Sequence, residues 1–507
     1  MKKRRLLSLF LVLVLLASCA PAAESPASDP IPAESTAALT PAPEPTPTST
    51  SEPTPTPEPV DFTEFLDGVN AARKAIAVQE APIDISAYTP DFHEQNHTFT
   101  EEEMERLTTA HEPEADLTLE DLLDDVDTFF LLLQTTYGPY YYFGGDDVFL
   151  PIRDAVKEKL AAAVTSDPWN REDALFLCEK LEGILYKHLF PVLVDGHFVI
   201  GRYAPRNTFA KYMYYVPDLY LDSMEGAENP DYLKPTIGPD GRICYWYAAL
   251  SHDGSDLPDT LDGNSLKWQQ ALRASSGGDA LAFSESEWEG IPVLTSRSMS
   301  ARGESADADE QALQRLAGCG GEYAGSPLLI FDVRGNGGGR DQYIMGWFQD
   351  WAGTSNPTRG AFAHRYSQLS CRVIYYPAEH MGTWGESCRR GTWAERSGPV
   401  FVLQDKGVAS SGETAVSFFR MAADTLFVGG PTLGCDLVPN NLTLYLPHSG
   451  LSCYFGTGIS FHETDENRDG IGYLPDLWVE PTEALEAVER LIEYYGLNAE
   501  PYKQASR

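Results

Sequence analysis

Strand-like and helix-like segments alternate in the C-terminal half of the chain, and this alternation limits the folds that the chain can adopt. A buried apolar run over Leu328–Val333 leads into a glycine-rich turn and a helix pattern over 342–351. A second run, Val400–Leu403, precedes a helix pattern over 411–421 and a third run, Leu426–Val428. Strands that alternate with helices favour an α/β sheet core whose helices cover its faces.

Three amphipathic helix patterns come earlier in the chain. The first begins at a capping box formed by Thr118 and Asp121 and ends at 137–139. The second is predicted to run over 151–163, with Pro151 in the first turn, where its missing N–H is tolerated. The third covers 171–188. Because short connections join them, we expect a small helical bundle.

These patterns divide the chain after residue 60 into four regions. We expect residues 61–190 to form an N-terminal helical region, 191–290 a β-rich middle segment, 291–490 the α/β core and 491–507 a C-terminal tail. The middle segment contains short β-rich runs broken by turn residues, at 192–194, 198–200, 212–216 and 243–248.

Residues 1–19 have the layout of a bacterial lipoprotein signal peptide. The basic Lys2–Arg5 precedes the apolar Leu6–Leu16, which is too short for a permanent membrane span. Leu16–Cys19 then follows the lipobox pattern, which predicts acylation of Cys19 with lipid chains such as palmitate. The mature protein would be held at the extracytoplasmic face of the cell membrane without a transmembrane helix. The alternative is an ordinary signal peptide with an incidental cysteine.

Residues 20–60 consist largely of Pro, Ala, Ser, Thr and Glu. Such a segment buries too little apolar surface to offset the entropy of ordering it, so it is predicted to be a disordered, semi-stiff linker.

Composition excludes several classes of function. The formal net charge of −38 argues against nucleic acid as a partner. The seven cysteines after Cys19 are scattered and form no Cys-x-x-Cys pair, which argues against a zinc or thioredoxin-like site. One or two disulfides remain open as an alternative for an exported chain.

Two turn segments contain residue types suited to acyl transfer. Phe331–Gly339 is a strand that runs into a glycine turn, and Gly407–Glu413 places Ser410 on a tight turn before a helix. A serine in that place exposes its hydroxyl, while the Ser411 amide and an amide of the Gly337–Gly338 turn can bind an oxyanion. Taken alone, the glycine turn could be a plain turn or a phosphate site, and Ser410 could be a helix N-cap.

Four motifs in order resemble the tail-specific (C-terminal-processing) serine peptidase family. Leu329–Gly338 resembles its DLRxNxGG segment, Pro399–Glu413 its PVxVLxxxxxASxxE segment, Val428–Gly434 its VGxxTxG segment and Gly472–Asp476 its GxxPD segment. The resemblance implies that Ser410 is the nucleophile. It also implies a crotonase/ClpP-like spiral core of β-β-α units.

One departure from the family pattern bears on mechanism. The tail-specific branch has a catalytic lysine directly after the glycine of TxGK, and Cys435 stands at that position here. We interpret Lys406, near Ser410, as a solvated lysine. A branch similar to tricorn core protease and the chlamydial protease-like factor uses Ser-His-Glu instead. Resemblance to that branch makes His197, in Val194–Phe198, the predicted base, although a lone histidine is more often a surface or core residue.

The third member of this triad is predicted from the tail motif. Alignment with the ExxGxxPD of the Ser-His-Glu branch puts Asp469 at the glutamate position, with Glu466 as the fallback. A competing interpretation covers the same stretch, because Asp465, Asn467 and Asp469 with Asp476 at the twelfth position resemble a calcium loop.

The sequence therefore predicts a lipid-anchored cell-surface serine peptidase that needs no cofactor and acts on peptides or proteins. In this interpretation His197 deprotonates Ser410, amides near Gly338 and Ser411 bind the oxyanion, and Asp469 orients the imidazole. A second interpretation is a catalytically silent peptidase fold that binds peptides or other ligands. A third is a purely structural surface lipoprotein.

Overall fold

The computed structural model describes residues 60–92, 99–164, 171–274, 280–301, 303–396 and 398–498. The signal peptide, Cys19 and nearly all of the predicted linker lie outside these residues. The described residues all belong to one compact unit.

A six-stranded sheet forms the centre of the C-terminal half, with the order β18-β14-β13-β10-β9-β8. Its strands are parallel except for β8, which pairs antiparallel with β9. The strands are β8 (Phe283–Trp288), β9 (Ile291–Ser296), β10 (Leu329–Asp332), β13 (Val400–Gln404), β14 (Thr425–Gly429) and β18 (Leu477–Trp478). The predicted alternation of strands and helices is confirmed.

Helices cover both faces of this sheet because side chains alternate along each strand. In β10, Leu329 and Phe331 pack with α9 and α11, whereas Ile330 packs on the opposite side with α1 and α12. The covering helices are α7 (Ala306–Gly318), α9 (Gln342–Ala352) and α11 (Ser411–Phe419) on one face, and α1 (Phe62–Ala77) and α12 (Ala484–Tyr495) on the other.

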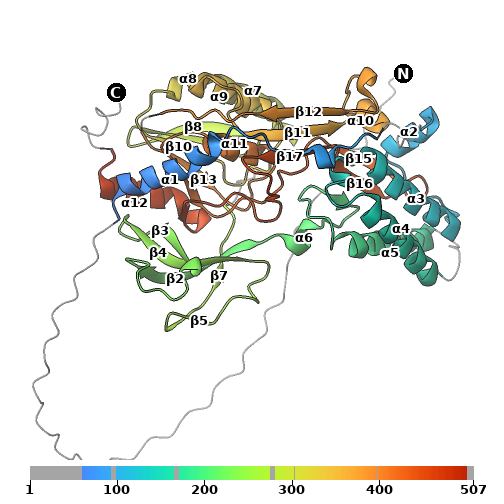
Figure 1. Ribbon diagram of the computed structural model, residues 1–507, viewed down its shortest axis with the longest axis horizontal. Coiled ribbons are helices and arrows are strands. Elements are labelled where there is room, and N and C mark those ends of the chain that lie inside the picture. Colours follow the sequence, from blue (N-terminus) through green and yellow to red (C-terminus); the bar gives the residue numbers. More distant parts are fainter. Residues whose placement is uncertain are drawn as a thin grey trace, which may run out of the picture. The chain divides into compact units, whose positions relative to one another are not determined.

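The predicted helical bundle is formed by α3 (Leu119–Thr136), α4 (Asp146–Ala163) and α5 (Arg171–Leu189), with α4 in contact with both neighbours (Figure 1). The capping box of Thr118 and Asp121 is confirmed. The predicted start of the second helix at Pro151 is wrong, because α4 begins at Asp146 and contains Pro151. Gly145 precedes it at a φ of 59°, and Asp146 and Asp147 supply negative charge to the first turn.

Two small sheets connect the bundle to the core. They are β12-β11-β17 and β1-β16-β15, and all of their neighbours are antiparallel. The strands are β1 (Val199–Ile200), β11 (Gly360–Arg365), β12 (Trp384–Arg389), β15 (Asn441–Tyr445), β16 (Ser452–Gly456) and β17 (Gly458–His462).

The middle segment forms a four-stranded sheet of order β3-β4-β2-β7. Met213 and Trp246 from this sheet pack against Trp478 of β18, so it adjoins the core. Its strands are β2 (Tyr212–Leu221), β3 (Leu233–Ile237), β4 (Ile243–Ser251) and β7 (Gln269–Gln270). The remaining short elements are α2 (Glu101–Thr108), α6 (Arg206–Phe209), α8 (Gly320–Tyr323), α10 (Gln368–Val373), β5 (Thr260–Leu261) and β6 (Asn264–Ser265).

The predicted strand at 192–194 is wrong. The Leu193 N–H donates to the Leu189 carbonyl at 3.0 Å, so these residues continue the last turn of α5. Leu193 is fully buried, and its apolar character reflects packing against the bundle and not a place in a sheet.

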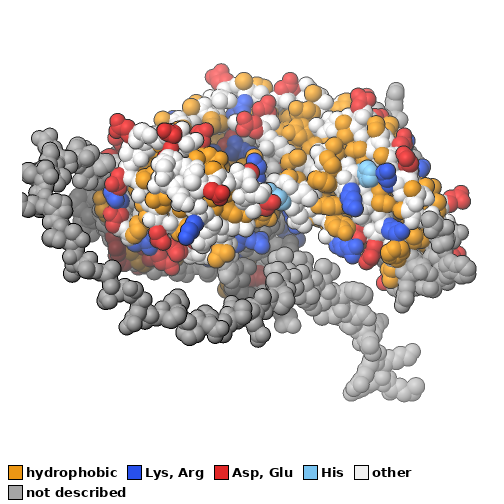
Figure 2. All heavy atoms as spheres, turned by 90° about the horizontal axis from the view of Figure 1, so that it is seen from below, with side chains coloured by type: hydrophobic (Ala, Val, Ile, Leu, Met, Phe, Trp, Pro, Cys, Tyr) orange, Lys and Arg blue, Asp and Glu red, His pale blue; other side chains and the backbone are white. Residues whose placement is uncertain are grey.

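No helix among the described residues is long and apolar enough to cross a membrane. The seven cysteines within the described ranges are all free, so the disulfide alternative has no support in the structure. On the face shown in Figure 2, Lys and Arg side chains lie in separate small groups among acidic and apolar ones. This face therefore has no continuous basic surface of the kind that binds nucleic acid.

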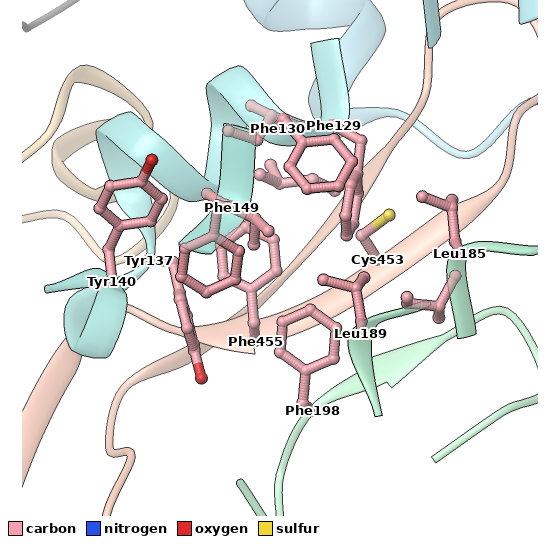
Figure 3. Packing of buried hydrophobic residues seen from close by; sticks show 14 of the residues in the cluster. Phe129, Phe130, Tyr137, Tyr140, Phe149, Leu185, Leu189, Phe198, Cys453 and Phe455 are labelled. Carbon is pink, nitrogen blue, oxygen red and sulfur yellow. The ribbon is translucent and has the colours of Figure 1, made fainter. Parts of the chain in front are cut away.

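An aromatic cluster packs the bundle against the segment that carries His197. Phe198 stacks on Phe455 of β16 with ring centroids 5.9 Å apart, and Tyr137 meets Phe198 edge-on at 5.5 Å (Figure 3). Phe129 and Leu189 belong to the same buried cluster. The residue after His197 is therefore fixed in the hydrophobic core.

We predict that Phe198→Ala lowers the free energy of unfolding by about 3–5 kcal/mol, because it deletes a fully buried aromatic ring. Phe176→Ala is the matched control. Phe176 is 56% exposed, and its loss should change stability by less than about 0.5 kcal/mol. Urea denaturation followed by fluorescence measures both. Equal effects of the two substitutions would contradict the packing described.

Candidate active site

Two turns lie side by side at the carboxyl ends of β10 and β13, which are parallel neighbours. The Ala409 N–H donates to the Asn336 carbonyl at 2.9 Å. One carboxylate oxygen of Asp405 accepts the N–H groups of Gly335 at 2.8 Å and Gly407 at 2.9 Å. These bonds fix the glycine turn against the serine turn, at the sheet edge where α/β proteins usually bind ligands.

Ser410 has a backbone conformation that is uncommon for a residue with a side chain. Its φ is 52° and its ψ is −125°, and it immediately precedes α11. Strain of this kind is concentrated at functional sites. The Ser411 N–H, at the start of the helix, donates no hydrogen bond to any residue that the structure describes. A backbone donor is thus left available beside the Ser410 hydroxyl.

The glycine turn approaches Ser410 closely. A Cβ atom on Gly338, whose φ is 100°, would lie 2.7 Å from the Ser410 Cβ and 3.0 Å from the Ser411 nitrogen, so only glycine fits. The Gly338 N–H donates to the Asn336 side chain at 3.0 Å. The N–H groups of Gly337 and Gly339 make no hydrogen bond within the described ranges. The predicted oxyanion roles of Gly337, Gly338 and Ser411 stay predictions.

A cavity of about 620 Å³ opens in front of these turns. Ser410, His197, Ser411 and Gly337 all line it, although His197 comes from the segment after the helical bundle. Predicted residues from distant parts of the chain thus share one cavity. Gly338, Asp469 and Glu466 do not line it.

The main chain of His197 is held by a buried carboxylate. One oxygen of Asp195 accepts the N–H groups of His197 at 2.8 Å and Phe198 at 3.2 Å, and the other accepts the Tyr137 hydroxyl at 2.8 Å. Burial, together with the nearby Arg206, lowers the pKa of the His197 imidazole to about 4. Its buried Nδ1 has no hydrogen-bond partner among the described residues.

The predicted acid, Asp469, contacts the backbone before His197 and not the ring. Its two carboxylate oxygens accept N–H groups from Gly196 at 2.7 Å, Asp436 at 3.0 Å and Leu437 at 3.1 Å. The fallback, Glu466, is exposed and lines a different, small cavity. Within the described ranges neither forms a hydrogen bond to the imidazole. Their catalytic roles stay predictions.

The calcium-loop alternative has no support in the geometry. Asp476 forms an ion pair with Arg73 and accepts the Phe427 N–H at 2.7 Å, whereas Asp469 is occupied by three backbone amides. The part of the chain that the structure describes holds no group of three or more His, Cys, Asp and Glu side chains placed to bind a metal ion.

Cys435, at the position of the family's lysine, is a buried neutral thiol. Burial raises its pKa well above the usual range, and the nearby Asp469 adds to the effect. A Cβ atom on Gly196 would lie 2.3 Å from the Cys435 sulfur, so the residue before His197 packs directly on it. Glu413 accepts the Cys435 N–H at 2.7 Å and the Gly434 N–H at 2.9 Å.

The interpretation of Lys406 as a solvated lysine is wrong, because its side chain is only 7% exposed. Its ammonium contacts four backbone carbonyl oxygens at 3.0–3.3 Å, those of Thr432, Leu433, Gly470 and Ile471. Burial lowers its pKa to about 8. Lys406 therefore joins the loop that carries Cys435 to the loop that follows Asp469.

Several polar residues of the cavity were not predicted from the sequence. His462 places its Nε2 3.4 Å from an Asp436 oxygen, and burial lowers the pKa of this imidazole to about 4. The Tyr473 hydroxyl donates to the other Asp436 oxygen at 2.7 Å. His364 contacts the Asn440 side-chain amide at 2.8 Å. His364 lies in β11, where buried and half-buried positions alternate from Ala361 onward, whereas His462 ends β17, which is buried throughout.

Three carboxyl groups near the cavity have raised pKa values, chiefly because they are buried. The pKa is about 7 for Asp195, about 7 for Asp436 and about 8 for Glu413. At pH values between the ordinary carboxyl pKa and these raised values, the three carboxyl groups bind more protons in the folded state than in the unfolded state. Stability is therefore lost as the pH rises through this range.

We predict that the thermal midpoint falls by a few degrees between pH 6.5 and pH 8. The lowered pKa values of His197 and His462 make stability rise with pH only below about pH 6.5. The lowered pKa of Lys406 makes stability rise with pH only above about pH 8. Asp195→Asn removes one of the titrating carboxyl groups but keeps an acceptor for the His197 N–H. In this variant the thermal midpoint should fall less over the same pH range. Differential scanning calorimetry across this range measures it, and a midpoint that rises with pH would refute the assignment.

Comparison with known proteins finds one match to a family model. Residues 291–479 match the model of Peptidase family S41. A search of curated proteins found no significant match.

Among solved structures, similarity extends over most of the chain at low identity. Mature CPAF is 12% identical, with 76% of this chain and 97% of that chain covered and a TM-score of 0.40. A lipoprotein from Streptococcus agalactiae is 15% identical, with coverage of 76% and 99% and a TM-score of 0.37. The photosystem II D1 C-terminal processing protease is 14% identical, with coverage of 73% and 97% and a TM-score of 0.33.

Proposed function

We propose that the chain is a serine peptidase of family S41 that hydrolyses peptide bonds through an acyl-enzyme on Ser410, with His197 as the base. The match of residues 291–479 to the model of Peptidase family S41 supports the proposal. The proposal includes the Ser-His branch of the family and a crotonase/ClpP-like spiral for the core. It also includes a lipid on Cys19 that anchors the protein to the extracytoplasmic face of the cell membrane, for which the lipobox pattern of Leu16–Cys19 is the support.

One observation carries the catalytic part of the proposal. Ser410 has a positive φ at the start of α11, beside the unbonded Ser411 N–H, and it shares a cavity with His197. A serine that served only as a helix N-cap would accept a backbone N–H of the first turn, and Ser410 forms no such side-chain bond. Its geometry therefore suits a nucleophile better than a cap.

The chemistry follows from the protonation states. With a pKa of about 4, the His197 imidazole is neutral at pH 7 and can accept the Ser410 hydroxyl proton as the oxygen attacks the peptide carbonyl. The Ser411 N–H and an N–H of the glycine turn stabilise the oxyanion. The imidazolium then gives its proton to the leaving amine. In the second half of the reaction His197 deprotonates a water molecule, which attacks the acyl-enzyme and releases the carboxylic acid product and the free Ser410 hydroxyl.

A second candidate is a catalytically silent fold that binds peptides. Two observations favour it: the His197 ring has no carboxylate partner in the described part of the chain, and a buried neutral thiol stands where the family's lysine would be. A base without an orienting acid is weaker, because nothing stabilises its protonated form.

We predict that a fluorophosphonate probe labels the wild-type protein on Ser410. Ser410→Ala should abolish labelling, and His197→Gln should slow it by at least about 10³-fold, because a serine hydroxyl is a poor nucleophile without a base. Labelling is measured by gel fluorescence and located by peptide mass spectrometry.

Ser284→Ala, an exposed serine of β8, is the control and should label like wild type. A well-folded wild-type protein that the probe does not label would favour the silent binding fold. Labelling that survives in His197→Gln would remove His197 from the mechanism.

We predict that Cys435→Ala leaves the labelling rate within a few-fold of wild type, because a thiol with a strongly raised pKa is protonated at pH 7 and cannot act as the base. The same probe assay measures the rate. A loss of several orders of magnitude, with an unchanged thermal midpoint, would assign Cys435 to the chemistry.

A further inference from the structure

One wall of the cavity is a face of the three-stranded sheet β12-β11-β17, whose strands lie next to one another in Figure 1. Ser387 pairs with Phe362, which pairs with Ser460, and Arg389 pairs with Gly360, which pairs with His462. Residues two apart on a strand face the same side. Six side chains of this face line the cavity and are here called the sheet wall: Phe362, His364, Ser387, Arg389, Ser460 and His462.

The sheet wall holds Arg389 on an aromatic support. The Arg389 guanidinium carbon lies 4.7 Å from the centre of the Phe362 ring, and the His462 and Phe362 rings meet edge-on with their centroids 5.1 Å apart. Gly360 makes this possible, since a Cβ there would lie 3.0 Å from the Phe362 ring. A guanidinium held this way loses little entropy when its N–H groups bind a ligand.

Arg389 has no ion-pair or hydrogen-bond partner among the described residues. The same holds for the side chain of Arg340, the other arginine that lines the cavity. Two acids also line it. Asp341 is exposed and acts on Arg389 only through space, and Asp436 is hydrogen-bonded to Tyr473, with a pKa raised to about 7. In a chain with a net charge of −38, these arginines provide a local attraction for anions beside the nucleophile.

We propose that the sheet wall selects peptides with an acidic side chain near the scissile bond, and that Arg389 binds this carboxylate. The proposal rests on the proposed peptidase function. The guanidinium presents a planar fork of N–H donors that matches a carboxylate. The Ser387 hydroxyl can add a donor beside it, whereas the Ser460 hydroxyl already donates to the Asp436 carbonyl at 2.6 Å. A cavity of about 620 Å³ has room for a short stretch of peptide that reaches from Ser410 to the wall.

The test is cleavage of a complex peptide mixture, with cut sites read by mass spectrometry. Wild type should cut peptides with Asp or Glu at one position near the bond, and the best Glu peptide should exceed its Gln counterpart about tenfold in kcat/KM. Arg389→Gln should remove this preference and keep fluorophosphonate labelling. Arg390→Gln, at the neighbouring exposed position outside the cavity, should retain it.

Two outcomes would overturn the proposal: cleavage without acidic enrichment, or enrichment that survives in Arg389→Gln. Each Glu peptide is also tested with a free and an amidated C-terminus. If the preference follows the terminal carboxylate instead of the side chain, the assignment of an acidic side chain is wrong.

A binding experiment tests the role of the sheet wall separately from the peptidase function. The same mixture is passed over immobilised Ser410→Ala protein, and the retained peptides are sequenced. If wild type cuts nothing, the peptidase function fails, while retention of acidic peptides that Arg389→Gln abolishes still supports the sheet wall. Retention without acidic enrichment overturns it.

Discussion

The hydrogen bond from the Ala409 N–H to the Asn336 carbonyl joins the two turns on which the site depends. Parallel pairing of β10 with β13 brings these turns to one sheet edge, and Asp405 binds amides of both. A non-glycine residue at positive φ costs of order 1–3 kcal/mol. The turn contacts and the buried helix α11, whose Ala415, Val416, Phe418 and Phe419 pack in the core, can hold Ser410 in this conformation.

The proposed base, His197, lines the same cavity as Ser410 but comes from a different part of the chain. His197 follows the helical bundle, and its neighbours are fixed by two independent means: Phe198 lies in the aromatic core, and Gly196 packs on Cys435. Buried carboxylates act on the same segment, since Asp195 and Asp469 both accept its backbone N–H groups. The acids near the imidazole thus position the main chain, whereas burial of the ring and the nearby positive charge of Arg206 keep the imidazole uncharged.

Features that depend on local sequence were predictable. The capping box at Thr118 and the buried strand at 329–332 depend on adjacent residues and on simple periodicity. The start of α4 was predicted wrongly at Pro151, because the sequence does not distinguish a proline in the first turn of a helix from a proline one turn later. The turn before α11 was predictable for the same reason as the strand, since Ser410 and its helix are continuous in sequence.

Features that depend on distant backbone were not predictable. The burial of Lys406 requires carbonyls from two separate loops, and the sheet wall requires a strand register that places Arg389, Gly360 and His462 in one row. Asp469 stood in the expected motif, but its partners are amides from other segments, which no spacing within the motif reveals.

The ammonium of Lys406 occupies a ring of backbone carbonyls of the kind that elsewhere surrounds a bound potassium or sodium ion. Here the cation is part of the chain, so it cannot dissociate and does not compete with ions in the medium. At pH values below its pKa of about 8, the loops around the candidate site are therefore cross-linked by a charge that belongs to the chain itself. A protein whose loops are held in this way would keep its geometry as the salt composition of its surroundings changes.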